Sequence, residues 1–364
     1  MRIGVLGAGQ LGMMLAEAAY RLALPITFLD PSKEARGSTP LKVLCADYTD
    51  EKALRQFVDE VDLVTYEFEN VPTQALEFLK DYATIAPSLR ALRVAQDRMS
   101  EKSLFVELGI PTPRFASIDS KEELRSAVEA IGLPAVLKTR RMGYDGKGQR
   151  VLRTEADLEE AWEALGAVPL ILEQFIAFDR EVSQVMARSA SGQVAFYPVV
   201  ENRHEGGILR VTQAPDPSAD EGIATLAQKY VHKIAQELDY VGVLTVEFFE
   251  QDGRLYANEM APRVHNSGHW TIEGAFTSQF ENHLRAILDW PLGETSAVSP
   301  SVMVNLIGVL PDQKALAAIP GAHIHFYGKA PRPGRKVGHV TILAPDAKTA
   351  LERAERVEAL WRHS

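Results

Sequence analysis

The sequence has little of what marks secreted or membrane-spanning proteins. Its 364 residues include one cysteine, Cys45, so no disulfide can form within the chain and a reducing compartment is the simplest setting. Cys45 follows Val43 and Leu44 in a strand-like run, and we expect it to pack in a core rather than act as a nucleophile. No run of about 18 apolar residues is present, and the first residues lack a signal-peptide pattern. We therefore expect a cytoplasmic protein with no membrane partner.

An excess of positive charge is also missing. The formal net charge is −10, which argues against a nucleic-acid partner, because such proteins usually carry a basic face. Local basic clusters can still hold phosphates inside an acidic protein. The hydrophobic fraction of 46% and the charged fraction of 24% are typical of globular proteins. The length suits two or three domains, and no internal repeat is apparent.

Alternating apolar runs and helical periodicities predict an α/β protein that is α+β in parts. The order of elements suggests domains at 1–95, 96–295 and 296–364. In the first, strands at 3–6, 25–29, 61–66 and 84–86 indicate a parallel sheet with helices on both faces. Farther along we expect strands at 135–138, 151–153, 170–174, 181–187, 243–250, 255–260, 302–306 and 323–327, and helices at 97–108, 121–131, 276–288 and 347–361.

A glycine-rich turn follows the first strand. Gly7, Gly9 and Gly12 have the spacing of a dinucleotide-binding fingerprint, and Asp30 ends the next strand. Glycines here let a phosphate approach a helix N-terminus, where free N–H groups favour an anion. An NAD-dependent oxidoreductase is one interpretation, and a tight turn without a ligand is another.

A second glycine-rich segment lies between two expected strands. Lys138 ends the first strand, and cations and glycines alternate up to Gln149. This composition suits a mobile flap whose amides and lysines cover a triphosphate, although a basic surface hairpin is the plain alternative. The expected strand at 170–174 leads into the segment Glu173–Ile176. Backbone groups there could meet an adenine edge, and Glu181 could accept ribose hydroxyls. These two acids could equally be solvated.

The strongest signal is a pair of acids on neighbouring strands. Glu247 lies in an apolar strand, and Asn258-Glu259 lies on the returning strand. If residues 252–254 form a three-residue loop, Glu247 and Glu259 face each other on one side of the sheet. Two such carboxylates repel unless a cation lies between them. Oxygen ligands beside an amide suit Mg²⁺ that carries nucleotide phosphates, and solvent-facing strand residues are the alternative.

Two polar loops complete the candidate site. Arg263, His265 and Asn266 follow the acidic strand, and such donors fit bicarbonate or an acyl phosphate. No histidine spacing there resembles a zinc site. The segment from Lys329 to His339 is a cationic bend in an acidic chain, which suggests a phosphate-bearing substrate or a solvated basic loop.

Taken in order, these motifs resemble the N5-carboxyaminoimidazole ribonucleotide synthetases, a family of the ATP-grasp superfamily. The most specific segments are 143–149, 258–270 and 332–339, and Gly9-Gln10-Leu11-Gly12 also matches the family's start. The resemblance spans nearly the whole chain. It implies an N-terminal Rossmann-like domain, a central ATP-grasp domain with a mobile flap, and a small C-terminal domain. Lys147 stands where some members carry arginine, so a bidentate phosphate contact is not expected there.

The resemblance also implies an activity: ATP, bicarbonate and 5-aminoimidazole ribonucleotide give the N5-carboxylated product, ADP and phosphate, in purine biosynthesis. Carboxyphosphate is the implied intermediate, Mg²⁺ the expected metal with Mn²⁺ as a substitute, and a homodimer the expected assembly. Glu247 and Glu259 would hold the metal, Arg263, His265 and Asn266 the bicarbonate, and Asp145 would orient the substrate amine. The nucleotide would contact Arg98, Lys138, Gly143, Tyr144, Asp145, Gly146, Lys147, Gly148, Gln149, Glu173, Gln174, Phe175, Ile176, Glu181, His204, Asn258 and Glu259, and the ribonucleotide would contact Gln10, Leu11, Tyr144, Asp145, Lys329 and Arg335.

Three other functions remain open. A formate-dependent transformylase acting on glycinamide ribonucleotide would share the ATP-grasp fold. An NAD-dependent oxidoreductase would leave Glu247, Glu259 and Lys138 without a role. A nonenzymatic nucleotide sensor would bind ATP without substrate-stimulated hydrolysis.

Overall fold

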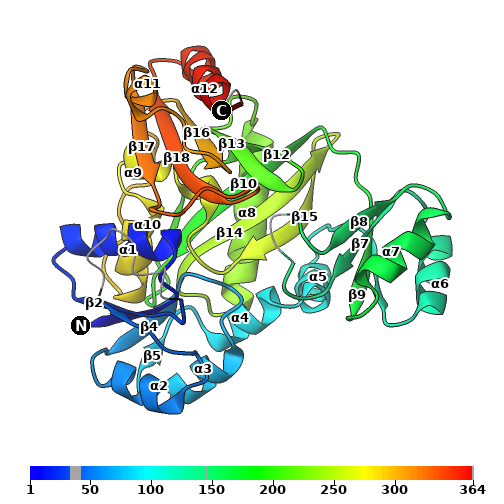
Figure 1. Ribbon diagram of the computed structural model, residues 1–364, viewed down its shortest axis with the longest axis horizontal. Helices are drawn as coiled ribbons and strands as arrows, with labels where there is room; N and C mark the ends of the chain where they lie inside the picture. Colours follow the sequence, from blue (N-terminus) through cyan, green and yellow to red (C-terminus); the bar gives the residue numbers. More distant parts are fainter. Residues whose placement is uncertain (33–41, 144–145, 363–364) are drawn as a thin grey trace.

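The computed structural model describes residues 1–32, 42–143 and 146–362, which form three sheets with their helices (Figure 1). The N-terminal sheet lies at the lower left of the view, the small sheet at the right, and the large sheet through the centre and top. No described helix is both long and apolar enough to cross a membrane.

The N-terminal sheet is parallel, with strand order β3-β2-β1-β4-β5. Its central strands β1 and β4 are buried along their whole length, as expected for a sheet covered by helices on both faces. The four predicted strands are confirmed. Cys45 follows the short β3 and is half-buried, so the expectation of a core cysteine was only partly right. The elements are β1 (Ile3–Leu6), α1 (Gln10–Arg21), β2 (Ile26–Leu29), β3 (Val43–Leu44), α2 (Glu51–Val58), β4 (Leu63–Tyr66), α3 (Thr73–Leu79), β5 (Thr84–Ile85) and α4 (Leu89–Ala95).

The small sheet is antiparallel, with order β6-β9-β7-β8, and helices α6 and α7 cover it. Helix α6 matches its predicted bounds because Ser120 accepts the N–H of Glu123 at its start and Gly132, with φ of 87°, ends it. The elements from the connecting helix onward are α5 (Arg98–Glu107), β6 (Phe115–Ile118), α6 (Lys121–Ile131), β7 (Ala135–Thr139), β8 (Gln149–Leu152), α7 (Asp157–Leu165) and β9 (Leu170–Gln174).

The large sheet has nine strands, in the order β15-β14-β10-β12-β13-β16-β18-β17 with β11 paired to β10. It runs across residue 296 without a break, because β16 pairs with β13. The domain limits therefore stay a prediction from sequence. The elements are β10 (Arg180–Arg188), β11 (Val194–Phe196), β12 (Val200–Glu205), β13 (Ile208–Ala214), α8 (Glu221–Glu237), β14 (Gly242–Gln251), β15 (Arg254–Ala261), η2 (Asn266–Gly268), α9 (Thr271–Gly274), α10 (Gln279–Ile287), β16 (Ser301–Ile307), α11 (Gln313–Ala317), β17 (Ala322–Phe326), β18 (Lys336–Leu343) and α12 (Ala347–Arg362).

Two predicted boundaries were wrong by a few residues. The helix expected at 276–288 begins at Gln279, because the Ser278 hydroxyl accepts the N–H of Glu281 and fixes the start. The strand expected at 151–153 is β8, which begins at Gln149 because that residue pairs with Lys138 of β7. Cross-strand pairing, which one segment alone does not reveal, set the second boundary.

One buried histidine joins the N-terminal sheet to the large sheet. His283 of α10 accepts the N–H of Val243 on β14 at its Nδ1, at 3.1 Å. Its Nε2 lies 2.9 Å from the Thr65 hydroxyl on β4. Burial lowers the pKa of His283 to about 4, so the ring is neutral at pH 7 and Nε2–H donates to Thr65.

This contact predicts sensitivity to acid. An unfolded histidine has a pKa of about 6.5, so the unfolded state binds the extra proton first and stability falls as the pH drops from 6.5 towards 4. Between pH 7 and pH 5, His283 should account for about 2 kcal/mol of lost unfolding free energy. We expect His283→Asn to lose less stability over this interval, measured by urea denaturation at both pH values. His323→Asn, at an exposed position, should keep the native pH dependence; equal slopes for the native protein and His283→Asn would contradict the prediction.

Candidate active site

The glycine-rich turn before α1 is occupied by a carboxylate of the protein itself. Glu67 accepts the N–H of Gly9 and the N–H of Gly12, both at 2.6 Å. A Cβ added at Gly7 would lie 2.6 Å from the Glu67 side chain, so this glycine is required for the close approach. The dinucleotide interpretation of the turn is therefore wrong, because an internal anion takes the place of the pyrophosphate.

The turn nevertheless leaves two amides for another anion. Among the described residues, no partner is found for the backbone N–H groups of Gln10 and Leu11, which lie in the first turn of α1. Both residues line a cavity of about 680 Å³. The ammonium of Lys329 contacts the Gln10 side chain at the same place. Three of the residues predicted from sequence to contact the ribonucleotide, Gln10, Leu11 and Lys329, thus meet there.

The cavity lies between parts of the chain that are far apart in sequence. Its predicted members are Gln10, Leu11, Arg98, Gly143, Glu259, Arg263, His265, Asn266 and Lys329. Arg335 is not among the lining residues; its guanidinium donates to the carbonyl of Ala330 at 3.3 Å within the cationic bend. The remaining predicted residues do not line this cavity and lie on the flap, on strands or directly after β9: Lys138, Gly146–Gln149, Glu173–Ile176, Glu181, His204, Glu247 and Asn258. Tyr144 and Asp145 fall outside the described residues.

The β14–β15 hairpin brings Glu247 and Glu259 together in a way that the sequence did not suggest. Its loop has two residues, Asp252 and Gly253, with φ of 50° and 70°, and not the three that we expected. Such a loop alone would put the two acids on opposite faces. A β-bulge restores the alignment, because Asn258 is an extra residue and Glu259 pairs directly with Glu247. The three-residue loop was wrong, and the facing carboxylates are confirmed.

Packing agrees with the bulge. Leu255, Ala257 and Met260 all lie in one core cluster, a spacing of two and then three residues. Asn258 and Glu259 consequently both lie on the other side of the strand. The buried Oδ1 of Asn258 has no hydrogen-bond partner in the described structure, which leaves an oxygen beside the two carboxylates.

The electrostatics of the acid pair are unequal. Burial, with the negative charges of Glu259 and Glu181, raises the pKa of Glu247 to about 7, although the charge of His204 opposes the shift. Burial also acts to raise the pKa of Glu259, but the charges of Arg98 and Lys138 hold it below its ordinary value. Arg98 donates to Glu259 at 3.1 Å. A divalent cation would relieve the repulsion between the two acids.

The donor set fits magnesium. Among the described residues, no three His, Cys, Asp or Glu side chains are grouped as ligands of one ion. Two carboxylates with one amide oxygen suit Mg²⁺, which takes one or two protein carboxylates and completes its shell with phosphate oxygens and water.

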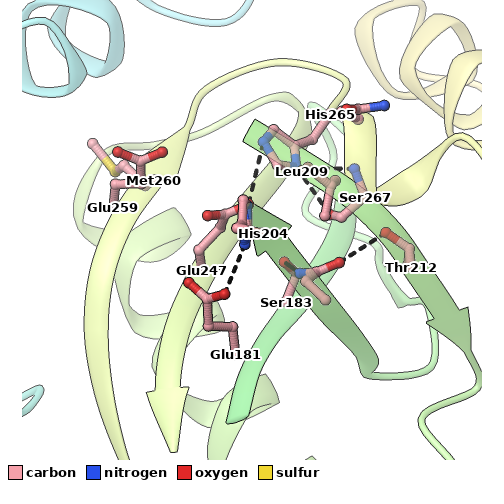
Figure 2. Close-up of polar contacts among 12 residues, drawn as sticks. Glu181, Ser183, His204, Leu209, Thr212, Glu247, Glu259, Met260, His265 and Ser267 are labelled. Carbon is pink, nitrogen blue, oxygen red and sulfur yellow. Dashed lines mark hydrogen bonds and ion pairs between the residues drawn. The ribbon is translucent and has the colours of Figure 1, made fainter. Parts of the chain in front are cut away.

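Two histidines lie near Glu247, one protonated and one neutral (Figure 2). His204 on β12 lies 2.8 Å from Glu181 through Nδ1, and Figure 2 shows it between Glu181 and Glu247. Burial would lower the pKa of His204, but the hydrogen bond to Glu181 and the charge of Glu247 raise it to about 9. Burial lowers the pKa of His265 well below its ordinary value. Its Nδ1 accepts the N–H of Ser267, so Nε2 carries the proton and lies 3.6 Å from Glu247.

On the small sheet, Lys138 and Glu173 form a buried ion pair of 2.9 Å. Glu173 is 1% exposed, so the solvated alternative for this residue is excluded. Its other partner is Lys102, at 3.5 Å, which sequence reasoning missed. Gln174 accepts from Arg114 at 3.2 Å, and the segment ends at the buried Ile176.

The glycine-rich flap connects β7 to β8 and touches the large sheet. Gly146 and Gly148 have φ of 73° and 71°, which only glycine adopts without strain. A Cβ added at Gly146 would collide with the backbone of Gly206 and Gly207 in the turn between β12 and β13. The flap therefore bridges the small and large sheets beside the acid pair.

The polar loop after β15 is tied to other parts of the chain. Arg263 forms an ion pair with Glu69, and Asn266 exchanges two amide hydrogen bonds with Asn305, at 3.1 and 2.8 Å. Sequence reasoning missed Glu69 and Asn305, as it missed Glu67. One signal was available: Glu67 and Glu69 follow β4 at the carboxyl end of a parallel strand, where α/β sheets bind ligands.

Comparison with known proteins identifies the family of this chain. Family models match the ribonucleotide synthetase preATP-grasp domain at residues 1–96, the ATP-grasp domain at 103–280, and the phosphoribosylaminoimidazole carboxylase C-terminal domain at 301–353. N5-carboxyaminoimidazole ribonucleotide synthase of Pseudomonas aeruginosa is 52% identical over 360 residues, or 99% of each chain. The chain belongs to the N5-carboxyaminoimidazole ribonucleotide synthase family.

Solved structures of this family have the same fold. The synthetase of Thermus thermophilus is 52% identical, with a TM-score of 0.94 over 98% of each chain. The synthase of Aspergillus clavatus, solved with ADP and 5-aminoimidazole ribonucleotide, is 34% identical, with a TM-score of 0.92 over 100% of this chain and 99% of that one. The resemblance that the sequence motifs indicated is confirmed.

The two histidines near Glu247 give a direct spectroscopic prediction. In the nucleotide-free protein, His204 should stay protonated through pH 8 and titrate near 9, whereas burial lowers the pKa of His265 so that it should stay neutral where an ordinary histidine is already protonated. Glu181→Gln should lower the pKa of His204 by removing its charged partner. Histidine ring ¹⁵N shifts measured by NMR against pH would report both. Glu205→Gln, which alters a carboxylate paired with Arg203, should leave His204 unchanged; titration of native His204 near pH 6.5 would contradict this assignment.

Proposed function

We propose that this protein uses ATP to carboxylate 5-aminoimidazole ribonucleotide with bicarbonate, giving N5-carboxyaminoimidazole ribonucleotide, ADP and phosphate. One observation carries the proposal beyond family membership. Glu259 of the acid pair lines the same cavity as Gln10 and Leu11 of the α1 turn. Phosphoryl transfer beside Glu259 and binding of a phosphate-bearing acceptor at the turn would therefore take place at one cavity.

The nucleotide would lie between the small and large sheets, beneath the flap. The backbone of Glu173–Ile176 would meet the adenine edge, and Glu181 would accept hydrogen bonds from the ribose hydroxyls. Lys138, Arg98 and the flap amides would contact the phosphates. Glu247 and Glu259, with Asn258 beside them, would hold Mg²⁺, which neutralises charge on the transferring phosphoryl group.

The acceptor side would use the cationic residues of the cavity. The amides of Gln10 and Leu11, with Lys329 and Arg335, would hold the ribonucleotide phosphate at a helix N-terminus. Arg263, His265 and Asn266 would hold bicarbonate. The Nε2–H of the neutral His265 lies 3.6 Å from Glu247, so it could donate to a bound oxyanion without adding a charge. Tyr144 and Asp145 are proposed, from sequence, to orient the substrate amine.

The chemistry divides into two steps. A bicarbonate oxygen attacks the γ-phosphorus of ATP, the bond to ADP breaks, and carboxyphosphate forms. The substrate amine then attacks the carboxyl carbon of carboxyphosphate, or of the CO₂ that carboxyphosphate gives when phosphate leaves, and the amine loses a proton. Because carboxyphosphate is short-lived in water, the flap must cover the site before the first step. The cytoplasm and a homodimer are the compartment and assembly that this proposal expects.

The proposal is tested by ADP release with each co-substrate. Release should require both bicarbonate and 5-aminoimidazole ribonucleotide, and should be absent with formate and glycinamide ribonucleotide. Release that formate supports would favour a transformylase instead. Nucleotide binding without substrate-stimulated release would favour a sensor.

Glu259→Gln should abolish ATP turnover while leaving the fold intact. The amide keeps the shape but removes the charge that holds the cation, and we expect turnover to fall by about 100-fold or more. Steady-state ADP release, with circular dichroism as a check on folding, measures both effects. Glu163→Gln, at an exposed position on α7, is the matched control and should keep full activity. Near-native turnover by Glu259→Gln would refute the metal assignment.

A further inference from the structure

Helix α5 presents two buried ionisable residues that the proposed reaction does not use. Glu101 and Lys102 are 2% and 0% exposed. With Arg98 they are spaced at i, i+3 and i+4, so all three lie on one face of the helix. Burying charged side chains is costly unless each is well paired. Their contacts should therefore reveal what they stabilise.

Both residues bind the backbone of β15 at the β-bulge. The Lys102 ammonium donates to the carbonyl of Ala257 at 3.2 Å, immediately before the extra residue Asn258. Glu101 Oε1 accepts the N–H of Met260 at 2.6 Å, immediately after Glu259. The two contacts thus bracket the two residues that oppose Glu247.

The position of β15 explains why such contacts are needed. It is an edge strand of the nine-stranded sheet, so its outer backbone groups have no neighbouring strand. The connection after α5 supplies further partners: Ala257 donates to the carbonyl of Pro111 at 2.7 Å and accepts from the Thr112 hydroxyl at 2.8 Å. A bulge leaves its extra residue out of the ladder, and here nonstrand groups fix the backbone around it.

We propose that Glu101 and Lys102 are positioning residues that hold the β-bulge, so that Asn258 and Glu259 face the divalent cation together. The inference rests on the proposed role of Glu247 and Glu259 in metal binding. Arg98 completes the arrangement from the same helix face by binding the Glu259 side chain. Lys102 also lies 3.5 Å from Glu173, which connects the bulge to the strand end that would meet adenine.

The test separates metal binding from folding. Calorimetry would measure the affinity for ADP with and without Mn²⁺. The ratio of the two affinities is the metal-dependent gain in ADP affinity. In Glu101→Leu, which removes the acceptor for the Met260 N–H, this gain should fall about 10-fold or more, as is usual when support for a metal ligand is lost. Glu101→Gln keeps an acceptor and should restore most of the gain. Lys102→Met, of similar length without the donor, should also reduce it.

A matched control tests whether burial alone explains the effect. Asp216 is a buried carboxylate paired with Arg180 at 2.6 Å, and Asp216→Asn should lower thermal stability without changing the gain. In a Glu259→Ala background, Glu101→Leu should have no further effect on the gain, because the ligand that it positions is gone.

The outcomes distinguish this inference from the proposed function. If Glu259→Ala leaves the gain intact, the metal assignment fails. If Glu259→Ala removes it but Glu101→Leu or Lys102→Met keeps it at the native value, the positioning role is overturned. Should Glu101→Leu not fold, Lys102→Met and the recovery in Glu101→Gln decide the question. Equal weakening of ADP binding with and without Mn²⁺ would indicate a purely structural role and would also overturn the inference.

Discussion

The repulsion between Glu247 and Glu259 is the constraint on which the rest of the site depends. Two carboxylates opposed on neighbouring strands are unfavourable without positive charge nearby, the more so because the Glu247 side chain is largely removed from water. Arg98 binds Glu259, and the charge of His204 acts on Glu247. These cations come from a helix and from a strand two places away in the sheet. The arrangement stabilises the pair only in part, which leaves a place for a divalent ion and the phosphates that it carries.

At the glycine turn before α1, a positive partial charge is balanced by a carboxylate of the chain itself. A helix N-terminus attracts an anion, and Glu67 supplies one from within the chain. Burial raises the pKa of Glu67, while the Gly12 and Gly9 amides act in the other direction. With those amides occupied, the adjacent Gln10 and Leu11 remain for one external phosphate. A motif typical of dinucleotide binding thus suits a monophosphate because of one residue 58 positions away from Gly9.

Local patterns predicted much of the fold and nine of the residues that line the cavity. Helix α6 and strand β9 have the bounds that periodicity and capping indicate, since their signals lie within the segments themselves. The pairing of Glu247 with Glu259 was also foreseen, but for the wrong reason, because the alignment comes from the bulge at Asn258 and not from the loop. The β15 backbone at this bulge is contacted by two side chains of α5, Lys102 and Glu101, which lie 155 and 159 residues away in the sequence from their partners. No local pattern encodes such contacts.

The acidic composition is compatible with phosphate chemistry because cations of the candidate site are paired with carboxylates at defined positions. Lys138 and Glu173 are paired within the small sheet, and Arg263 and Glu69 are paired across the cavity wall. Each buried cation thus has a carboxylate that holds its geometry while the rest of its surface is available to an oxyanion. Preorganised donors of this kind avoid reorganisation during reaction, which is how a site of fixed charges lowers a phosphoryl-transfer barrier. The same pairing shows how a net charge of −10 is compatible with cations that line an internal site, because carboxylates such as Glu173 and Glu69 lie beside them.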